Sequence, residues 1–308
     1  MSRIEIRAED VLTVIAAAAM LLFLGVKSFG TLHLDEQRYW DFAFIILPVA
    51  LLIFRAAVRY AFRPIGSNGT HILSVETGSV IRDWFPFLVF MLLYESFWTA
   101  TWAIVAPVDK DAMLLRWDMT LFGGTGSVWF DPYVRGWLTS VLAVAYFLHL
   151  VLPPVMGLIW YRRDLRVFRG FLLSVLIIFM IGSQGYMLVP AIGPGIAFPS
   201  LYHHTLTGSV YTNITELIDT VRAPRDVFPS LHVGLSAIIL WFAWRRGRTT
   251  FAIFLLPVLA NWISTLYLRA HYTIDVIAGW IVAAASIWLA ERALRLEERL
   301  RGAAAASK

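Results

Sequence analysis

Residues 271–292 read HYTIDVIAGWIVAAASIWLAER, and this stretch decides the kind of fold that the chain adopts. Beyond Asp275 it carries no charged side chain until Glu291. A helix needs about 20 largely apolar residues to cross the hydrocarbon core of a bilayer. The stretch therefore predicts a membrane-spanning helix that begins with a histidine and a carboxylate.

The rest of the chain has the same apolar character. Of its 308 residues, 59% are hydrophobic and 15% are charged, whereas soluble domains are about 25% charged. Further apolar segments of similar length are 11–29, 41–58, 85–107, 136–160, 171–190, 229–245 and 250–268. We therefore expect an all-α integral membrane protein, a polytopic bundle of about eight transmembrane helices.

The basic residues predict how this bundle is oriented. With the N-terminus in the cytoplasm, most of the 26 basic residues fall on the cytoplasmic side, as the positive-inside rule requires. The exceptions are Lys27, Arg38, Lys110, Arg116, Arg135, Arg222, Arg225 and Arg269. We therefore expect both termini to be cytoplasmic, and the net charge of +5 to reflect topology and not a nucleic-acid partner.

Three regions are expected along the chain. Residues 1–84 hold N-terminal membrane helices and a cytoplasmic loop, 85–292 the catalytic bundle, and 293–308 a cytoplasmic tail that is disordered at its end. Arginine greatly outnumbers lysine, which is typical of a GC-rich bacterial genome. The expected location is the bacterial cytoplasmic membrane.

The first histidine motif is Phe228-Pro229-Ser230-Leu231-His232, at the start of a predicted helix. Proline suits the first turn, because its missing N–H would have no partner within the helix. The N–H groups of this turn and the helix dipole favour an anion, so we expect Ser230 and Leu231 to bind a phosphate. His232 is then placed to protonate a leaving oxygen.

The second motif is His271-Tyr272-Thr273-Ile274-Asp275. His271 and Asp275 are four residues apart and share one helix face. A carboxylate there accepts a proton from one imidazole nitrogen and raises the nucleophilicity of the other. Arg269 precedes the motif and is a candidate clamp for phosphate oxygens. Both motif helices are expected to begin on the outer side, so His232, His271 and Asp275 are predicted to lie at one depth.

The candidates for a metal site are few. The chain has no cysteine, which excludes a thiol nucleophile and a cysteine metal site. A zinc site of His203, His204, His232 and His271 is an alternative, but adjacent histidines chelate one ion poorly and no His-Glu-x-x-His helix exists. We therefore expect neither a metal nor another cofactor.

Polar residues also lie inside the predicted membrane helices. Glu95 is an intramembrane carboxylate, which indicates either a head-group or proton site or a pairing with a neighbouring helix, and both readings stay open. His149 and Asn261 are expected to form interhelical hydrogen bonds.

The two histidine motifs resemble the last two signature motifs of the type 2 phosphatidic acid phosphatase superfamily, and they are closest to its inositol phosphorylceramide synthase-like branch. That branch has Pro-Ser-Leu-His, as at 229–232, where lipid phosphatases have Pro-Ser-Gly-His. Residues 271–276 are also similar to a motif of sphingomyelin synthases. The resemblance covers roughly 85–292. Weaker support comes from Asp118–Gly123, Tyr146–His149 ahead of Pro153-Pro154, and Pro190–Pro194.

The resemblance implies a core of six helices and a phosphohistidine mechanism that needs no metal. It makes His271 the nucleophile, Asp275 the residue that orients it and His232 the acid for the leaving group.

Two departures concern the phosphate clamp. The phosphatase motif Lys-x6-Arg-Pro is absent, and the Ser-Arg pair ahead of the third motif is Ser264-Thr265 here. Both departures favour the synthase-like branch. We therefore expect Arg225 and Arg269 to supply the missing positive charge.

These features predict a membrane enzyme that takes a phosphoryl or phospho-head group from a phospholipid or lipid phosphate in the outer leaflet. A lipid or polyol hydroxyl as acceptor makes it a transferase, and water makes it a phosphatase. A lipid transporter or a non-catalytic lipid-binding protein is the alternative from another class. Such a protein has no reason to place two histidines at one depth with Asp275.

Overall fold

The structure, a computed structural model, describes residues 7–15, 82–88, 109–213 and 225–306. The chain divides into two compact units. Pro107–Arg299 form one, and Met1–Ala106 with Leu300–Lys308 form the other. In the second unit, residues 8–15 and 82–88 are helical, and Arg7 forms an ion pair of 2.7 Å with Asp83.

Long helices dominate the unit Pro107–Arg299. They are α6 (Gly136–Tyr161), α7 (Leu165–Leu188), α10 (Leu231–Arg246), α11 (Arg248–Tyr267) and α12 (Thr273–Ala306). The short elements are α4 (Asp111–Phe122), α5 (Gly126–Trp129), η1 (Asp131–Tyr133), α8 (Pro194–Ala197) and η2 (Pro199–Leu201). The described residues contain no strand, and their isolated β-bridge joins Ala191 and Asp226.

Four of the described helices are long and apolar enough to cross a membrane, namely α6, α7, α11 and α12 up to Ala303. The expectation of a helical integral membrane protein is therefore confirmed. The predicted segments 11–29, 41–58 and 85–107 lie largely outside the described residues. The 16 residues of α10 span only about 24 Å, which is less than the ~30 Å of a bilayer core.

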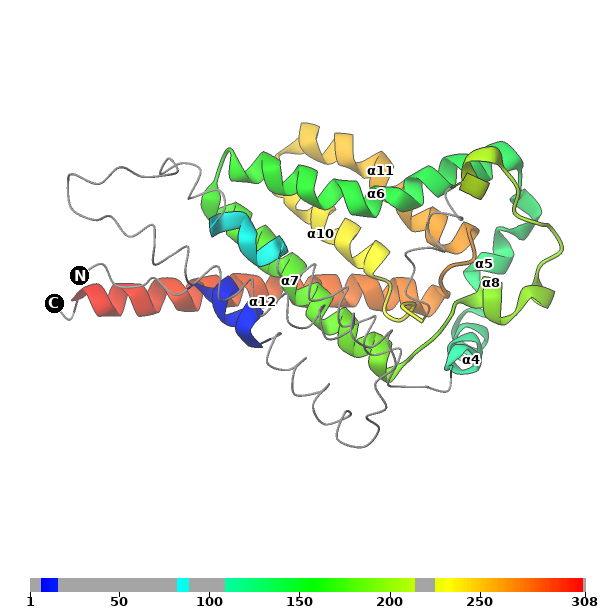
Figure 1. Cartoon of the computed structure of the whole chain (residues 1–308), viewed down its shortest axis with the longest axis horizontal. Helices are drawn as coiled ribbons and strands as arrows, with labels where there is room; N and C mark the ends of the chain where they lie inside the picture. Colours follow the sequence, from blue (N-terminus) through cyan, green and yellow to red (C-terminus); the bar gives the residue numbers. More distant parts are fainter. Residues whose placement is uncertain (1–6, 16–81, 89–108, 214–224, 307–308) are drawn as a thin grey trace, which may run out of the picture. The chain divides into compact units, whose positions relative to one another are not determined.

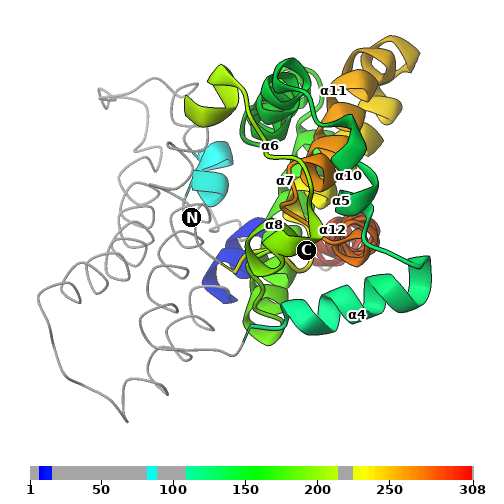
Figure 2. The same ribbon diagram turned by 90° about the vertical axis from the view of Figure 1, so that its right-hand side faces the viewer.

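The short elements gather at one end of the bundle. Figure 1 shows α4, α5 and α8 beside the ends of the long helices, and Figure 2 looks onto this end. Helix α7 packs on both α6 and α10, and α11 packs on α6 and α10. The N-termini of α10 and α12 face this same end, so both histidine motifs lie at the end of the bundle where the short helices gather.

Glycines let the start of α10 approach its neighbours closely. A Cβ atom at Gly279 of α12 would lie 2.5 Å from the carbonyl oxygen of Ser230, and one at Gly185 of α7 would lie 2.3 Å from Cδ of Pro229. Atoms this close would clash, so only glycine fits at both places. Small residues at such crossings are typical of membrane helix packing.

Side-chain hydrogen bonds connect α11 to the helices on either side of it. Asn261 donates to the carbonyl oxygens of Ala145 and Tyr146 in α6 over 3.0 and 3.2 Å, as the sequence predicts. Trp262 donates to the hydroxyl of Ser236 in α10 over 2.7 Å. These bonds fix the part of α6 that lies next to the first histidine motif.

The glycine packing predicts a difference between two alanine substitutions. Gly279→Ala should lower the free energy of unfolding by about 1–3 kcal/mol, because the new methyl group meets backbone atoms that cannot move aside. Gly170→Ala is the control, because a Cβ there would meet only Leu294 and Phe242 at 3.5 Å or more. Unfolding in detergent, followed by circular dichroism, measures both. Equal stability of the two variants would contradict the close approach of α10 and α12.

Candidate active site

The two histidine motifs meet where α10 and α12 begin. Nε2 of His271 lies 3.4 Å from Nδ1 of His232. The backbone N–H of Ser230 donates to the carbonyl oxygen of Asp275 over 3.1 Å. Only 2% of His271 is exposed, and Asp275 is fully buried. The structure thus brings together the three residues that the sequence indicates as catalytic.

Asp275 lies beside the ring of His271. Its Oδ2 atom is 3.6 Å from Nδ1 of His271 and accepts the N–H of Tyr272 over 2.8 Å. Its Oδ1 atom is buried and accepts no hydrogen bond from the residues that the structure describes. Buried polar atoms almost always have partners, so an exception here points to function. The backbone N–H of Tyr272 thus holds the carboxylate with its Oδ2 atom toward His271.

Ser230 and Leu231 shape the first turn of α10. The hydroxyl oxygen of Ser230 accepts the N–H of Val233 over 3.4 Å, which makes Ser230 the N-cap. Leu231 is buried against Gly182 of α7. Both side chains are therefore engaged in holding the turn that carries His232. A phosphate at this turn would meet its backbone N–H groups.

A third histidine, His149 of α6, lies against His232. Their ring centroids are 3.9 Å apart, and the ring of Tyr146 stacks on His232 at 4.1 Å with an interplanar angle of 28°. Nδ1 of His149 lies 2.7 Å from the carbonyl oxygen of Tyr146, which can only accept, so this nitrogen carries a proton. The expected interhelical hydrogen bond is wrong, because this bond stays within α6. The sequence feature that indicates the observed bond is the i,i+3 spacing of Tyr146 and His149, which places both side chains on one helix face.

Arg269 is held by an aspartate of the short-helix region. Its guanidinium donates to Oδ1 of Asp131 over 2.8 Å and lies 4.1 Å from the ring centroid of Tyr202. Burial alone raises the pKa of Asp131, but hydrogen bonds from His204 and His203, with the charge of Arg269, lower it overall. Burial raises the pKa of Tyr202. Asp131 therefore stays charged while the Tyr202 phenol stays neutral, and the two hold Arg269 in place.

Arg225 forms an ion pair as well. Its Nε and Nη2 atoms donate to the carboxylate of Asp109. Both predicted clamp residues are thus bound to aspartates, and both have positive φ angles, 90° at Arg225 and 59° at Arg269. Each holds the chain just ahead of a histidine motif. Glu95 lies outside the described residues.

Asp118 of α4 caps helix α12. Its two carboxylate oxygens accept the N–H groups of Thr273 and Ile274 over 2.8 and 2.9 Å, and Asp118 is fully buried. An anion at a helix N-terminus satisfies unpaired donors and complements the helix dipole. Asp118 therefore sets where α12 begins, and with it the positions of His271 and Asp275.

Asp111, seven residues before Asp118, connects the loop at Ile192 and Gly193 to the second histidine motif. Its carboxylate accepts the N–H groups of Ile192 and Gly193 over 3.0 and 2.9 Å and the hydroxyl of Tyr272 over 2.9 Å. A Cβ at Gly193 would lie 2.6 Å from the carbonyl oxygen of Ala270, and its φ angle is 91°. The glycine is needed for the loop to pack on the turn ahead of His271.

Sequence reasoning missed the roles of Asp111 and Asp131. A spacing of seven residues puts Asp111 and Asp118 on one face of α4, and this spacing indicates that the two carboxylates act on the same side of the helix. Their partners are more than 80 residues away along the chain, so only the folded structure identifies them.

The described residues contain no group of three or more histidine, aspartate or glutamate side chains with metal-binding geometry. The ring of His204 instead lies 3.0 Å from Asp131, and the backbone N–H of His203 donates to the same carboxylate. This arrangement gives no support to a zinc site that combines these residues with His232 and His271.

Comparison with known proteins gives one match. Residues 113–289 match the family model described as the PAP2 superfamily, which covers more than half of the chain. No curated protein matches the chain, and no solved structure matches it. The matched range includes Asp118, His149, His232, His271 and Asp275.

The cap on α12 can be compared with a cap at the far end of the bundle. Asp164 caps α7 by accepting the N–H groups of Arg166 and Val167 over 2.9 and 3.1 Å. Asp118→Ala should lower the free energy of unfolding by about 1–3 kcal/mol and also reduce labelling of His271 by a phosphate donor. Asp164→Ala should cost about 1 kcal/mol and leave the labelling intact. Equal labelling of both variants, measured below their unfolding temperatures, would contradict the role of Asp118.

Proposed function

We propose that this chain, which belongs to the PAP2 superfamily, is a membrane phosphotransferase that works through a phosphohistidine at His271. The superfamily comprises phosphatases and phosphotransferases, and a membrane-embedded member acts on lipid phosphates. The observation that carries the proposal is the row formed by Asp275, His271 and His232, with distances of 3.6 and 3.4 Å between neighbours. Asp275 and His271 are buried, and His232 is half-buried.

In the first step, Nε2 of His271 attacks the phosphorus of a phospholipid or lipid phosphate. An N–P bond forms and the bond from phosphorus to the leaving oxygen breaks, while His232 gives that oxygen a proton. The carboxylate of Asp275, whose Oδ2 lies 3.6 Å from Nδ1 of His271, stabilises the charge that develops on the ring. The leaving group departs as an alcohol.

In the second step, an acceptor hydroxyl attacks the phosphohistidine. His232 takes the proton of the hydroxyl, an O–P bond forms and the N–P bond breaks, which returns both histidines to their first state. Splitting the displacement in two lowers each barrier. The same residue serves as acid and then as base, as microscopic reversibility requires.

The resting arrangement constrains how the substrate enters. Nε2 of His271 is in hydrogen-bonding distance of Nδ1 of His232, so the nitrogen that attacks is covered. The phosphoryl group must replace this contact, which requires His232 to turn. The first-turn N–H groups of α10 lie beside His232 and are suited to the phosphate oxygens.

Burial favours a lipid or polyol acceptor over water. His271 is 2% exposed and Asp275 is fully buried at rest, which limits the access of water to the nucleophile. Exclusion of water protects a reactive intermediate from hydrolysis. With the Pro-Ser-Leu-His motif, this supports the inositol phosphorylceramide synthase-like branch and a site facing the outer leaflet. A lipid phosphate phosphatase is the second candidate, and the superfamily supports it equally.

Trapping of the covalent intermediate tests the proposal. Purified protein is mixed with a phospholipid labelled in its phosphate and then denatured. The label should stay on the protein in alkali and be lost in acid, as expected for a phosphohistidine. His271→Ala should abolish the label, and Asp275→Asn should slow its formation by about 10²- to 10⁴-fold.

The acceptor is identified in the same assay by adding ceramide, diacylglycerol, inositol or water alone and analysing the products. Transfer to a hydroxyl acceptor supports the transferase, and release of phosphate to water alone supports the phosphatase. Labelling that persists in His271→Ala, or lipid movement across vesicles without any covalent label, would refute the proposal in favour of another nucleophile or a transporter.

Tyr146 is proposed as a positioning residue for His232. Its ring stacks on the imidazole at 4.1 Å, and a π-face favours a protonated histidine. Tyr146→Ala should therefore lower kcat about tenfold with little change in KM, whereas Tyr146→Phe should keep most of the activity. Steady-state kinetics on both variants measure this. A rise in KM alone would assign Tyr146 to substrate binding and contradict the positioning role.

A further inference from the structure

A polar cavity lies between the N-terminal end of α7, the C-terminal end of α10 and the middle of α12. Its lining residues are Arg166, Val167, Gly170, Phe242, Arg245, Glu291, Leu294 and Arg295. Its volume is about 160 Å³, more than ten times the ~10–15 Å³ that a single water needs. The cavity therefore has room for a polar group of the size of a phosphodiester.

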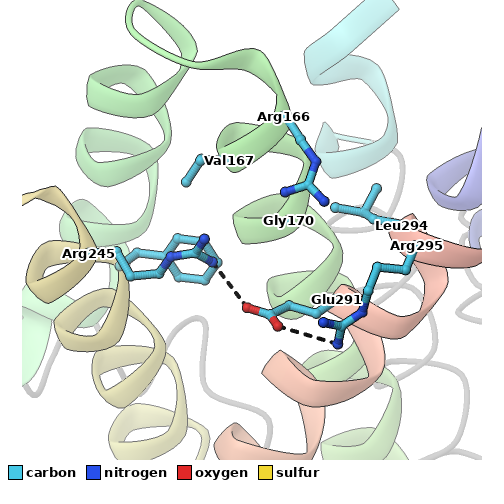
Figure 3. Close-up of a pocket in the computed structure, with 8 residues that line it drawn as sticks. Arg166, Val167, Gly170, Arg245, Glu291, Leu294 and Arg295 are labelled. Carbon is cyan, nitrogen blue, oxygen red and sulfur yellow. Dashed lines mark hydrogen bonds and ion pairs between the residues drawn. The ribbon is translucent and has the colours of Figure 1, made fainter. Parts of the chain in front are cut away.

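The rim of this cavity is basic. Arg245 and Arg295 approach the carboxylate of Glu291 from opposite sides, over 3.1 and 3.5 Å (Figure 3). Arg166 extends from α7 toward the same space and pairs with Glu298, which does not line the cavity, over 2.6 Å. Three guanidinium groups and two carboxylates leave one positive charge. One anionic phosphodiester would neutralise it.

The arginines keep many donors for a ligand. Each guanidinium carries five N–H donors, and the carboxylates use one or two of them on each arginine. Arg245 and Glu291 are each 35% exposed, so their ion pair is partly screened by water and is readily rearranged. Planar guanidinium groups bind phosphate oxygens in pairs.

The floor of the cavity is apolar and contains a glycine that packing does not require. A Cβ at Gly170 would lie 3.5 Å from Leu294 and 3.9 Å from Phe242, which is ordinary contact. Alanine would fit and would favour the helix by about 1 kcal/mol. At Gly185 and Gly279, in contrast, a Cβ would clash with backbone or ring atoms. Gly170 thus leaves open the space that a larger side chain would fill.

The cavity lies far from the histidines. Fourteen residues of α10 run from His232 to Arg245, which corresponds to about 20 Å along the helix. On α12, Asp275 and Glu291 are about 24 Å apart. These lengths approach the ~30 Å of a bilayer core, so the two sites face opposite leaflets. The positive-inside bias of the sequence places the cavity on the cytoplasmic side.

We propose that this cavity binds the head group of an anionic phospholipid in the cytoplasmic leaflet. The phosphodiester contacts Arg166, Arg245 and Arg295, and the acyl chains lie along the lipid-facing sides of α7 and α12. Basic pockets between membrane helices on this side of a bilayer are suited to such head groups. The binding site is independent of the reaction at His271, so either proposal stands if the other fails.

Lipid binding to purified protein in a neutral detergent tests this site. Native mass spectrometry compares phosphatidylglycerol with phosphatidylcholine. The wild-type protein should retain phosphatidylglycerol in preference. Arg245→Ala and Gly170→Leu should each weaken its binding about tenfold, the first by removing a charge and the second by filling the floor.

Arg163→Ala is the matched control. Arg163 is an exposed arginine of the α6–α7 connection and does not line the cavity, so its loss should leave binding unchanged. Inorganic phosphate at the lipid concentration should not displace the lipid. Unfolding temperatures are measured for each variant, and Arg295→Ala replaces any variant that fails to fold. Equal binding of both lipids, equal loss in Arg163→Ala, or displacement by inorganic phosphate would each overturn the proposal.

Discussion

The site depends on one crossing, where the first turn of α10 rests on the first turn of α12. The N–H of Ser230 donates to the carbonyl oxygen of Asp275, and Gly279 leaves room for that turn. Because the donor and the acceptor are backbone atoms of the two motifs, the distance between the histidines follows from main-chain geometry. The crossing therefore fixes the backbone of both histidines, and only a rotation of the His232 side chain can separate its ring from that of His271.

Three carboxylates support this crossing from the region between the third and fourth predicted membrane helices. Asp118 caps the N-terminus of α12, and Asp111 accepts a hydrogen bond from the backbone of Gly193. Asp131 accepts a hydrogen bond from the guanidinium of Arg269. All three are buried, and each accepts more than one hydrogen bond, so their desolvation is compensated. The short elements α4 and η1, which carry these carboxylates, thus hold the second histidine motif in position.

Within the residues that the structure describes, the sequence predicts the long apolar helices well because hydropathy depends only on local composition. The segments predicted at 136–160 and 250–268 correspond to α6 and α11 within two residues at each end. Hydropathy does not predict the polar ends of two of these helices. Helix α7 begins at Leu165, six residues early, because Asp164 caps it, and α12 continues to Ala306 through charged residues that favour helix but not lipid. In the site, the sequence predicts that His271 and Asp275 are neighbours, because they are only four residues apart. The partners of Asp118 and the stacking of Tyr146 on His232 are tertiary, and no pattern in one chain reveals them.

The contact between Nε2 of His271 and Nδ1 of His232 has a chemical consequence. In the proposed mechanism, the ring of the general acid His232 covers the nucleophilic nitrogen of His271 in the resting state. Electrophiles that modify free imidazoles should therefore find His271 unreactive until a phosphate separates the rings. Phosphate mimics should in turn show slow-onset inhibition, since their association waits on the rotation of His232. The resting enzyme is thus latent, and its substrate completes the reactive geometry.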